Sequence, residues 1–139
     1  MTLSALPGLG EEIELVIEVS RFSFVKRRPD GRVHFVSPVP TLFNYGSVPN
    51  TRAADGDPLD VLLLGPRLRR GARRRAHVLG VVDFLDGGAP DPKIVAGAPG
   101  ARLGTWERAQ VTTFFQVYAR AKRVLDPAGG GALYRGWLA

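Results

Sequence analysis

Apolar and polar residues alternate along 12–19, where every odd position is aliphatic and Glu14 and Glu18 stand at even positions. Side chains of a β-strand alternate between its two faces, so this period of two predicts a half-buried strand. Further strands are predicted over 22–26, 32–36, 61–64, 77–84 and 94–96. The sequence Pro29-Asp30-Gly31 favours a hairpin turn between the first two of these, and a loop is expected at Asn44-Tyr45-Gly46.

The apolar spacing becomes helical further along the chain. Positions i, i+3, i+4 and i+7 are filled by Val111, Phe114, Phe115 and Tyr118. This stripe predicts a core-facing helix over 105–123, with Thr105 as its N-cap and Lys122 in its last turn. A flexible tail is expected after Pro127. Short strands joined by Gly/Pro turns, with no helices between them, predict a mainly β fold in the form of a small closed or nearly closed barrel.

The composition narrows the functional classes. With 139 residues and an ordinary apolar fraction, the chain is expected to form a single domain over 1–139. Cysteine is absent, which excludes disulfides, thiolate zinc sites and a cysteine nucleophile. Only His34 and His77 are present, so neither a histidine-rich metal site nor a Ser-His-Asp triad is expected. The first residues lack a signal-peptide pattern and no apolar run suits a membrane span, so a soluble cytoplasmic protein is expected.

The net charge of +6 is unevenly distributed, with arginines crowded into the segment 67–75 around Gly71. These residues are Arg67, Arg69, Arg70, Arg73, Arg74 and Arg75. Such a run could contact nucleic-acid phosphates. The alternative is a solvated loop between two strands, and it is the better one because no aromatic residue is interleaved for base stacking. Nucleic acid is therefore not expected as a partner.

The sequence Asp55-Gly56-Asp57-Pro58-Leu59-Asp60 brings three carboxylates together directly before the apolar run 61–64. Two like charges about 4 Å apart repel by roughly 4 kcal/mol at an effective dielectric constant of 20, so such a group beside a core indicates a bound cation. Oxygen ligands favour Mg²⁺, Mn²⁺ or Ca²⁺ over zinc. An EF-hand is excluded because its twelfth position would be Pro66. Metal-dependent phosphate chemistry is the first hypothesis.

A second acidic segment begins at the end of the predicted strand 77–84. It contains Asp83, Asp86 and Asp91, with a Gly-Gly turn between the last two and Lys93 just beyond. Glu18, on the predicted strand 12–19, adds a carboxylate from a third part of the chain. Aspartates in turns often only cap their loops, which would explain Asp86. That alternative explains the three aspartates at 55–60 less well.

These motifs resemble the soluble family I inorganic pyrophosphatases. The resemblance is carried by Asn44-Tyr45-Gly46, by Asp55 to Leu62, by Gly80-Val81 with Asp86, Asp91, Lys93 and Val95-Ala96, by Phe114 to Tyr118, and by Gly136-Trp137. It extends from about Ile13 to Trp137, and the spacing from Tyr45 to Asp55 matches the family without gaps. It implies a mainly β fold with α: a five-stranded OB-like closed β-barrel with a C-terminal helix packed on it.

The resemblance also implies an activity and a set of site residues. The activity is Mg²⁺-dependent hydrolysis of pyrophosphate to two phosphates, with Mn²⁺ or other divalent ions as further candidates. Matching positions imply metal ligands at Asp55, Asp60, Asp86 and Asp91, with Glu18 holding a metal or its waters. They imply Asp57 as the general base and Lys26, Tyr45, Lys93 and Tyr118 as contacts to phosphate oxygens. A homo-oligomer, a hexamer or a trimer, is implied as well. Tyr118 could instead be only a core residue of its helix.

The chain departs from the family pattern around the phosphate. Lys26-Arg27-Arg28 stands where a Lys-Tyr-Glu triplet is usual, and the segment between Gly31 and Tyr45 is short and lacks the expected arginine. Ala119 replaces a lysine, and the terminal helix after Gly136-Trp137 is essentially missing. Each lost cationic contact would cost about 2–4 kcal/mol in the transition state, unless Arg28 or Arg32 substitutes. Reduced activity is expected, and a paralogue that binds metal-pyrophosphate or another polyphosphate without rapid turnover is the alternative.

Overall fold

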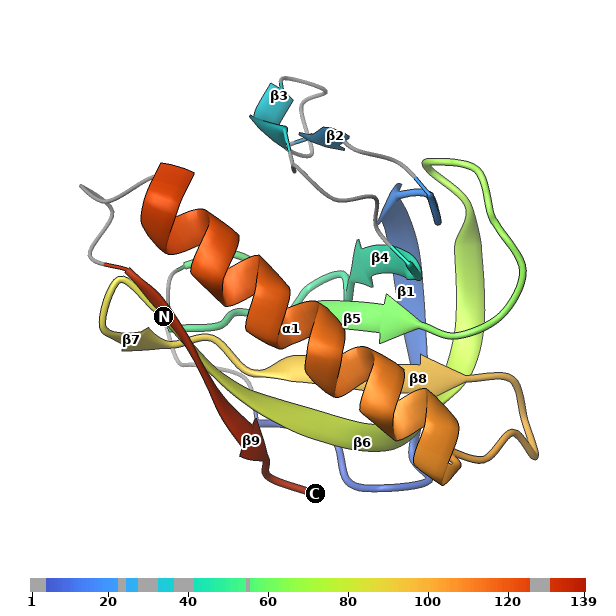
Figure 1. Ribbon diagram of the computed structural model, residues 1–139. Helices are drawn as coiled ribbons and strands as arrows, with labels where there is room; N and C mark the ends of the chain where they lie inside the picture. Colours follow the sequence, from blue (N-terminus) through green and yellow to red (C-terminus); the bar gives the residue numbers. More distant parts are fainter. Residues whose placement is uncertain (1–4, 23–24, 28–32, 37–41, 55, 126–130) are drawn as a thin grey trace.

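A curved β-sheet crossed by a long helix makes up most of the computed structural model (Figure 1). The structure describes residues 5–22, 25–27, 33–36, 42–54, 56–125 and 131–139. Its elements are β1 (Glu12–Val19), β2 (Val25–Arg27), β3 (Val33–Val36), β4 (Asn44–Ser47), β5 (Asp60–Leu63), β6 (Arg73–Asp86), β7 (Ala89–Pro90), β8 (Lys93–Gly97), α1 (Thr105–Leu125) and β9 (Ala132–Trp137). Among the described residues, no helix has both the length and the apolar character that crossing a membrane requires.

Strands β1, β4, β5, β8 and β6 are hydrogen-bonded neighbours in that order, and β6 pairs back with β1. Five strands therefore form a ring, as expected from the resemblance. The β5–β8 pair is parallel and the other pairs in the ring are antiparallel. Outside the ring, β2 and β3 pair as the predicted hairpin, whose turn residues 28–32 lie beyond the described parts of the chain.

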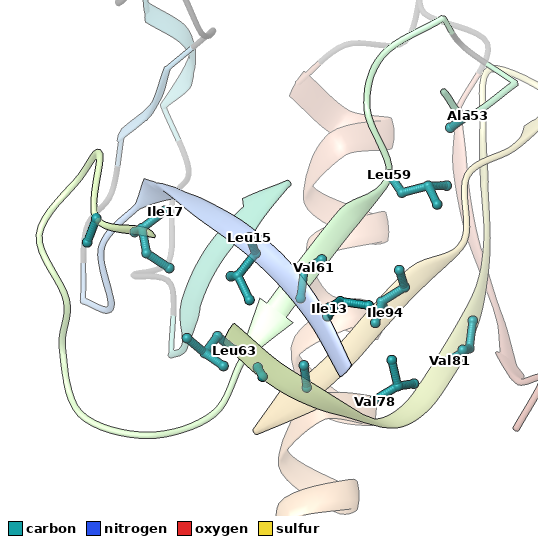
Figure 2. Packing of buried hydrophobic residues seen from close by; sticks show 13 residues of the cluster. Ile13, Leu15, Ile17, Ala53, Leu59, Val61, Leu63, Val78, Val81 and Ile94 are labelled. Carbon is teal, nitrogen blue, oxygen red and sulfur yellow. The ribbon is translucent and has the colours of Figure 1, made fainter. Parts of the chain in front are cut away.

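The interior of the ring is filled by aliphatic side chains from its strands (Figure 2). Ile13, Leu15 and Ile17 of β1 point inward, which confirms the alternation seen in the sequence. Val61 and Leu63 of β5 join them, whereas Leu62 between them packs on the other side of the sheet under α1. Because both faces of β5 are buried beyond Asp60, its sequence is apolar from Val61 to Leu63 rather than alternating.

Helix α1 covers the outer face of the ring with aromatic side chains. Phe114 and Phe115 are buried against the sheet, and the Phe115 ring lies 5.8 Å from the ring of Phe84 on β6. Each buried phenylalanine contributes roughly 2–3 kcal/mol through the hydrophobic effect, so this stripe holds the helix in place. The first helical hydrogen bond runs from the Arg108 N–H to the Gly104 carbonyl at 2.9 Å. Gly104 is therefore the cap, one residue before the predicted one.

Two segments expected to be irregular are strands. Asn44-Tyr45-Gly46 lies in β4, where a Cβ added to Gly46 would come within 2.1 Å of the Val16 carbonyl oxygen of β1. Glycine is required there because the two backbones approach so closely. The second segment is β9, which pairs antiparallel with β6 where a tail was expected. Trp137 of β9 donates from Nε1 to Thr112 Oγ1 of α1 at 3.0 Å, which ties this strand to the helix.

The arginine-rich segment is only partly a loop. β6 begins at Arg73, four residues before the predicted start, and pairs with β1. On the solvent face of this pair, Arg73 lies 3.2 Å from Glu14 and Arg75 lies 3.9 Å from Glu12. Acidic residues of the same chain thus face these two arginines.

Candidate active site

Lys93 at the start of β8 is the centre of a buried ionic cluster. Its Nζ donates to Asp60 Oδ2 at 2.6 Å and to Asp91 Oδ2 at 2.7 Å. The side chains of Lys93 and Asp91 are 3% and 6% exposed, and that of Asp60 is 15% exposed. Lys93 carries one positive charge against two carboxylates, so these three groups together are net negative. Such a cluster favours a further cation.

The fold brings these three residues together through strand register. Asp60 begins β5 and is the direct partner of Lys93 in the parallel β5–β8 pair. Asp91 precedes Lys93 by two residues and donates its backbone N–H to the Phe84 carbonyl of β6 at 2.8 Å. Residues two apart in an extended segment point to the same side, so Asp91 and Lys93 face the same space. The family resemblance placed Asp60 in the same site, but its direct contact with Lys93 follows from strand register and leaves no local signal in the sequence.

The surroundings of Lys93 set its protonation state. Burial by itself lowers the pKa of Lys93, but electrostatic interactions with Asp60, Tyr45, Asp91 and Tyr118 outweigh it and hold the pKa well above its ordinary value. Its ammonium group also lies 5.8 Å from the centroid of the Tyr45 ring. Lys93 is therefore protonated and positively charged at neutral pH. The two phenols expected to contact phosphate both lie close enough to Lys93 to influence it.

A second ion pair lies beside Tyr118. Asp86, the last residue of β6, accepts a hydrogen bond from Lys122 Nζ in the last turns of α1. The Lys122 ammonium group is 5.9 Å from the centroid of the Tyr118 ring. Gly87 and Gly88 follow Asp86 with φ values of 61° and 82°, the left-handed conformation of a tight β6–β7 turn. Lys122 was predicted only as a charge at the helix end.

The remaining predicted site residues are arranged as follows. Glu18 lies at an irregularity of β1, where the pairing with β4 shifts between Ile17 and Val19. Asp57 is exposed on the loop before β5. Lys26 lies on β2 opposite Phe35, and its side chain and Asp55 are outside the described parts of the chain. Glu18 and Asp57 both have interaction partners.

The donor set suits a hard divalent cation. Asp60 and Asp91 approach one ammonium group closely, and carboxylate oxygens are the ligands that Mg²⁺ and Ca²⁺ prefer. Among the residues the structure describes, no group of three or more acidic or histidine side chains is gathered closely enough to hold a metal. Asp55 of the same motif is not among the described residues.

Comparison with known proteins decides the family. The sequence model of the inorganic pyrophosphatases matches residues 15–125, which include the Lys93 and Lys122 pairs. The chain belongs to the inorganic pyrophosphatase family. The solved inorganic pyrophosphatase of Coxiella burnetii is similar in structure, with a TM-score of 0.77 and 25% identity over 96% of this chain and 89% of that one. That of Thermus thermophilus has a TM-score of 0.74 at 27% identity, over 97% of this chain and 88% of that one.

This chain matches only part of the length of its curated relatives in this family. The soluble inorganic pyrophosphatase of Oryza sativa subsp. indica is 34% identical over 98 residues, which is 65% of this chain and 46% of that relative. Inorganic pyrophosphatase 1 of Pseudomonas syringae pv. tomato is 46% identical over 54 residues, which is 38% of this chain and 31% of that relative. The matched segment thus spans less than half of these relatives.

Proposed function

We propose that this protein hydrolyses inorganic pyrophosphate to two phosphates with the help of Mg²⁺. The observation that carries the proposal is the buried cluster in which Asp60 and Asp91 share Lys93. It combines carboxylates for a hard cation with a positively charged ammonium group for a phosphate oxygen. Membership of the inorganic pyrophosphatase family over 15–125 supports the same chemistry.

In this proposal the acidic residues hold the metal. Asp60, Asp91 and Asp86 would supply ligands, with Asp55 and Glu18 completing the sites. When bound, Mg²⁺ lowers the pKa of a coordinated water and neutralises charge on phosphate oxygens. Mn²⁺ is an alternative ion, since it accepts the same oxygen ligands.

The other residues act on the substrate and the proton. Lys93 binds a phosphate oxygen in place of one of its carboxylate contacts, and Lys26 supplies a second ammonium group. The hydroxyl groups of Tyr45 and Tyr118 donate hydrogen bonds to phosphate oxygens. Asp57 accepts the proton of the attacking water as general base, a role for which its exposed loop gives access to solvent.

The wider setting of the site forms part of the proposal. We take the five-strand ring to be an OB-like closed barrel that acts as a single domain over 1–139. We expect a cytoplasmic homo-oligomer, a hexamer or trimer, with pyrophosphate as its small-molecule partner. Of this setting, curated relatives named soluble inorganic pyrophosphatases support a soluble protein with pyrophosphate as its substrate.

A second candidate function is a protein that binds metal-pyrophosphate or another polyphosphate without rapid turnover. One observation favours it: Ala119, where a phosphate-binding lysine was expected, is only 2% exposed and packs in the apolar cluster under α1. A cation is thus lost from that position. The assay below separates the two functions, because a binding protein would hold pyrophosphate and release no phosphate.

The test is phosphate release from pyrophosphate, tripolyphosphate and ATP with Mg²⁺, Mn²⁺ and Zn²⁺. We expect release from pyrophosphate with Mg²⁺, and a loss of about 10²–10⁴-fold in Asp57→Asn, the effect of removing a general base. Glu14→Gln is the matched control, because it neutralises an exposed carboxylate on β1 that pairs with Arg73. No release by the wild-type protein, or full activity of Asp57→Asn, would contradict the proposed enzyme.

A further inference from the structure

Helix α1 presents a lysine to the site from a position that the family resemblance did not indicate. Lys122 donates to the carboxylate of Asp86, and the two side chains are 16% and 29% exposed. Its ammonium group lies beside the Tyr118 ring, and Tyr118 in turn is close enough to influence Lys93. The Phe84 ring lies 6.0 Å from the Tyr118 ring and 5.4 Å from Lys93 Nζ, so Tyr118 stands beside Lys122 and next to the aromatic ring that Lys93 approaches.

Helix geometry explains why residue 122 reaches this place and residue 119 does not. Residues four apart lie on the same face of a helix, so Lys122 stands one turn beyond Tyr118 on the same side. Residue 119 is rotated by about 100° from Tyr118, and Ala119 accordingly packs in the apolar cluster under the helix. In this chain, a cation beside Tyr118 can come from position 122 without burying a lysine stem at position 119.

We propose that Lys122 is a phosphate-binding residue of the site, which holds Asp86 in the metal-free protein and binds a pyrophosphate oxygen once Asp86 is engaged in metal binding. The inference rests on the proposed function and supplies a cation that the missing lysine would otherwise have provided. An ammonium group binds phosphate well as a point charge, and the flexible lysine stem lets it exchange one oxyanion for another.

A purely structural role for Lys122 would be to join α1 to the end of β6. Both roles predict some loss of stability when the charge is removed, so stability cannot distinguish them. They differ in ligand binding. A residue that competes for Asp86 and also binds phosphate must affect metal and phosphate in opposite directions, whereas a structural link would not separate the two ligands in this way.

The experiment measures two affinities by calorimetry, for Mg²⁺ alone and for inorganic phosphate at saturating Mg²⁺. In Lys122→Met, which keeps the aliphatic stem, we expect Mg²⁺ to bind about two- to fivefold more tightly because a partly exposed ion pair no longer competes. We expect phosphate to bind about ten- to a hundredfold more weakly, the effect of losing a charged hydrogen bond. Lys122→Arg should recover most of the phosphate affinity.

Arg120→Ala is the matched control, since it removes one positive charge from an exposed position two residues earlier on the same helix. It should leave both affinities within about twofold, as expected for an exposed charge. If the wild-type protein hydrolyses pyrophosphate and Lys122→Met binds phosphate as Arg120→Ala does, this inference alone is overturned. If the wild-type protein releases no phosphate, the proposed function fails, and the inference fails with it.

Discussion

Two regions of this molecule contain ion pairs of similar chemistry in opposite surroundings. At the site, Lys93 is almost fully buried between Asp60 and Asp91. On the solvent face of β1 and β6, Arg73 pairs with Glu14 while both side chains are more than half exposed. The buried lysine has lost its water and depends on its partners, whereas the exposed arginine is solvated with or without Glu14. A buried cluster of this kind costs free energy to form, which makes it a sign of function rather than of stability.

The largest effect on the free energy of unfolding is expected from removing the buried ammonium group of Lys93. Lys93→Met leaves two carboxylates close together in a site with little water, and we expect the free energy of unfolding to fall by about 3–5 kcal/mol. Saturating Mg²⁺ should restore part of it, about 2.7 kcal/mol at a hundred times the dissociation constant, because the carboxylates are then neutralised. Urea denaturation with and without Mg²⁺ measures both. A variant as stable as the wild type without metal would contradict this account.

A smaller effect on the free energy of unfolding is expected when the pH is raised. The pKa of Lys93 in the folded protein is raised above its ordinary value of 10.5. A raised pKa stabilises the fold fully at pH values below the unfolded-state pKa, and this contribution is lost as the pH rises through the folded-state pKa. The stability difference between wild type and Lys93→Met should thus stay level from about pH 7 to about pH 10 and decrease only above that. Denaturation curves at several pH values check this, and a decrease already between about pH 7 and 9 would contradict it.

The smallest effect is expected at the exposed pair. Arg73→Met deletes a cation from the β1–β6 surface, and we expect a loss of at most about 1 kcal/mol, with unchanged phosphate release. The same denaturation experiment measures it beside Lys93→Met. Equal losses in the two variants would mean that burial does not distinguish the two regions.

Much of the fold could be predicted because its signals are local. The alternation of β1 directly reflects a strand with one face in the ring, and the apolar stripe of α1 reflects packing on a sheet. Strand β4 could not be predicted, because Asn44 and Gly46 are poor strand formers that only the tertiary structure explains. Asn44 accepts from the Leu68 N–H at 2.9 Å and donates to the Pro66 carbonyl at 2.7 Å.

The candidate site likewise contains contacts that have a local sequence signal and contacts that depend on tertiary structure. The sequence could predict that Asp91 and Lys93 point to the same side, because they stand two residues apart in an extended segment that leads into a buried strand. The contact between Lys93 and Asp60 depends on the register of β5 against β8, and that between Lys122 and Asp86 depends on how α1 lies against the sheet. Neither arrangement leaves a local signal. Strand β9 escaped prediction for a similar reason, because its pairing with the end of β6 stabilises a sequence with little apolar alternation.

The most direct test of the account is phosphate release from pyrophosphate by Asp60→Asn across a series of Mg²⁺ concentrations. Asp60 contacts Lys93 and would also be a metal ligand, so the variant removes a charge from the centre of the proposed site. We expect an active wild type, a loss of about a hundredfold or more in Asp60→Asn, and no loss in Glu14→Gln. If Asp60→Asn releases phosphate as fast as Glu14→Gln at every Mg²⁺ concentration, the buried cluster is not the site of the reaction.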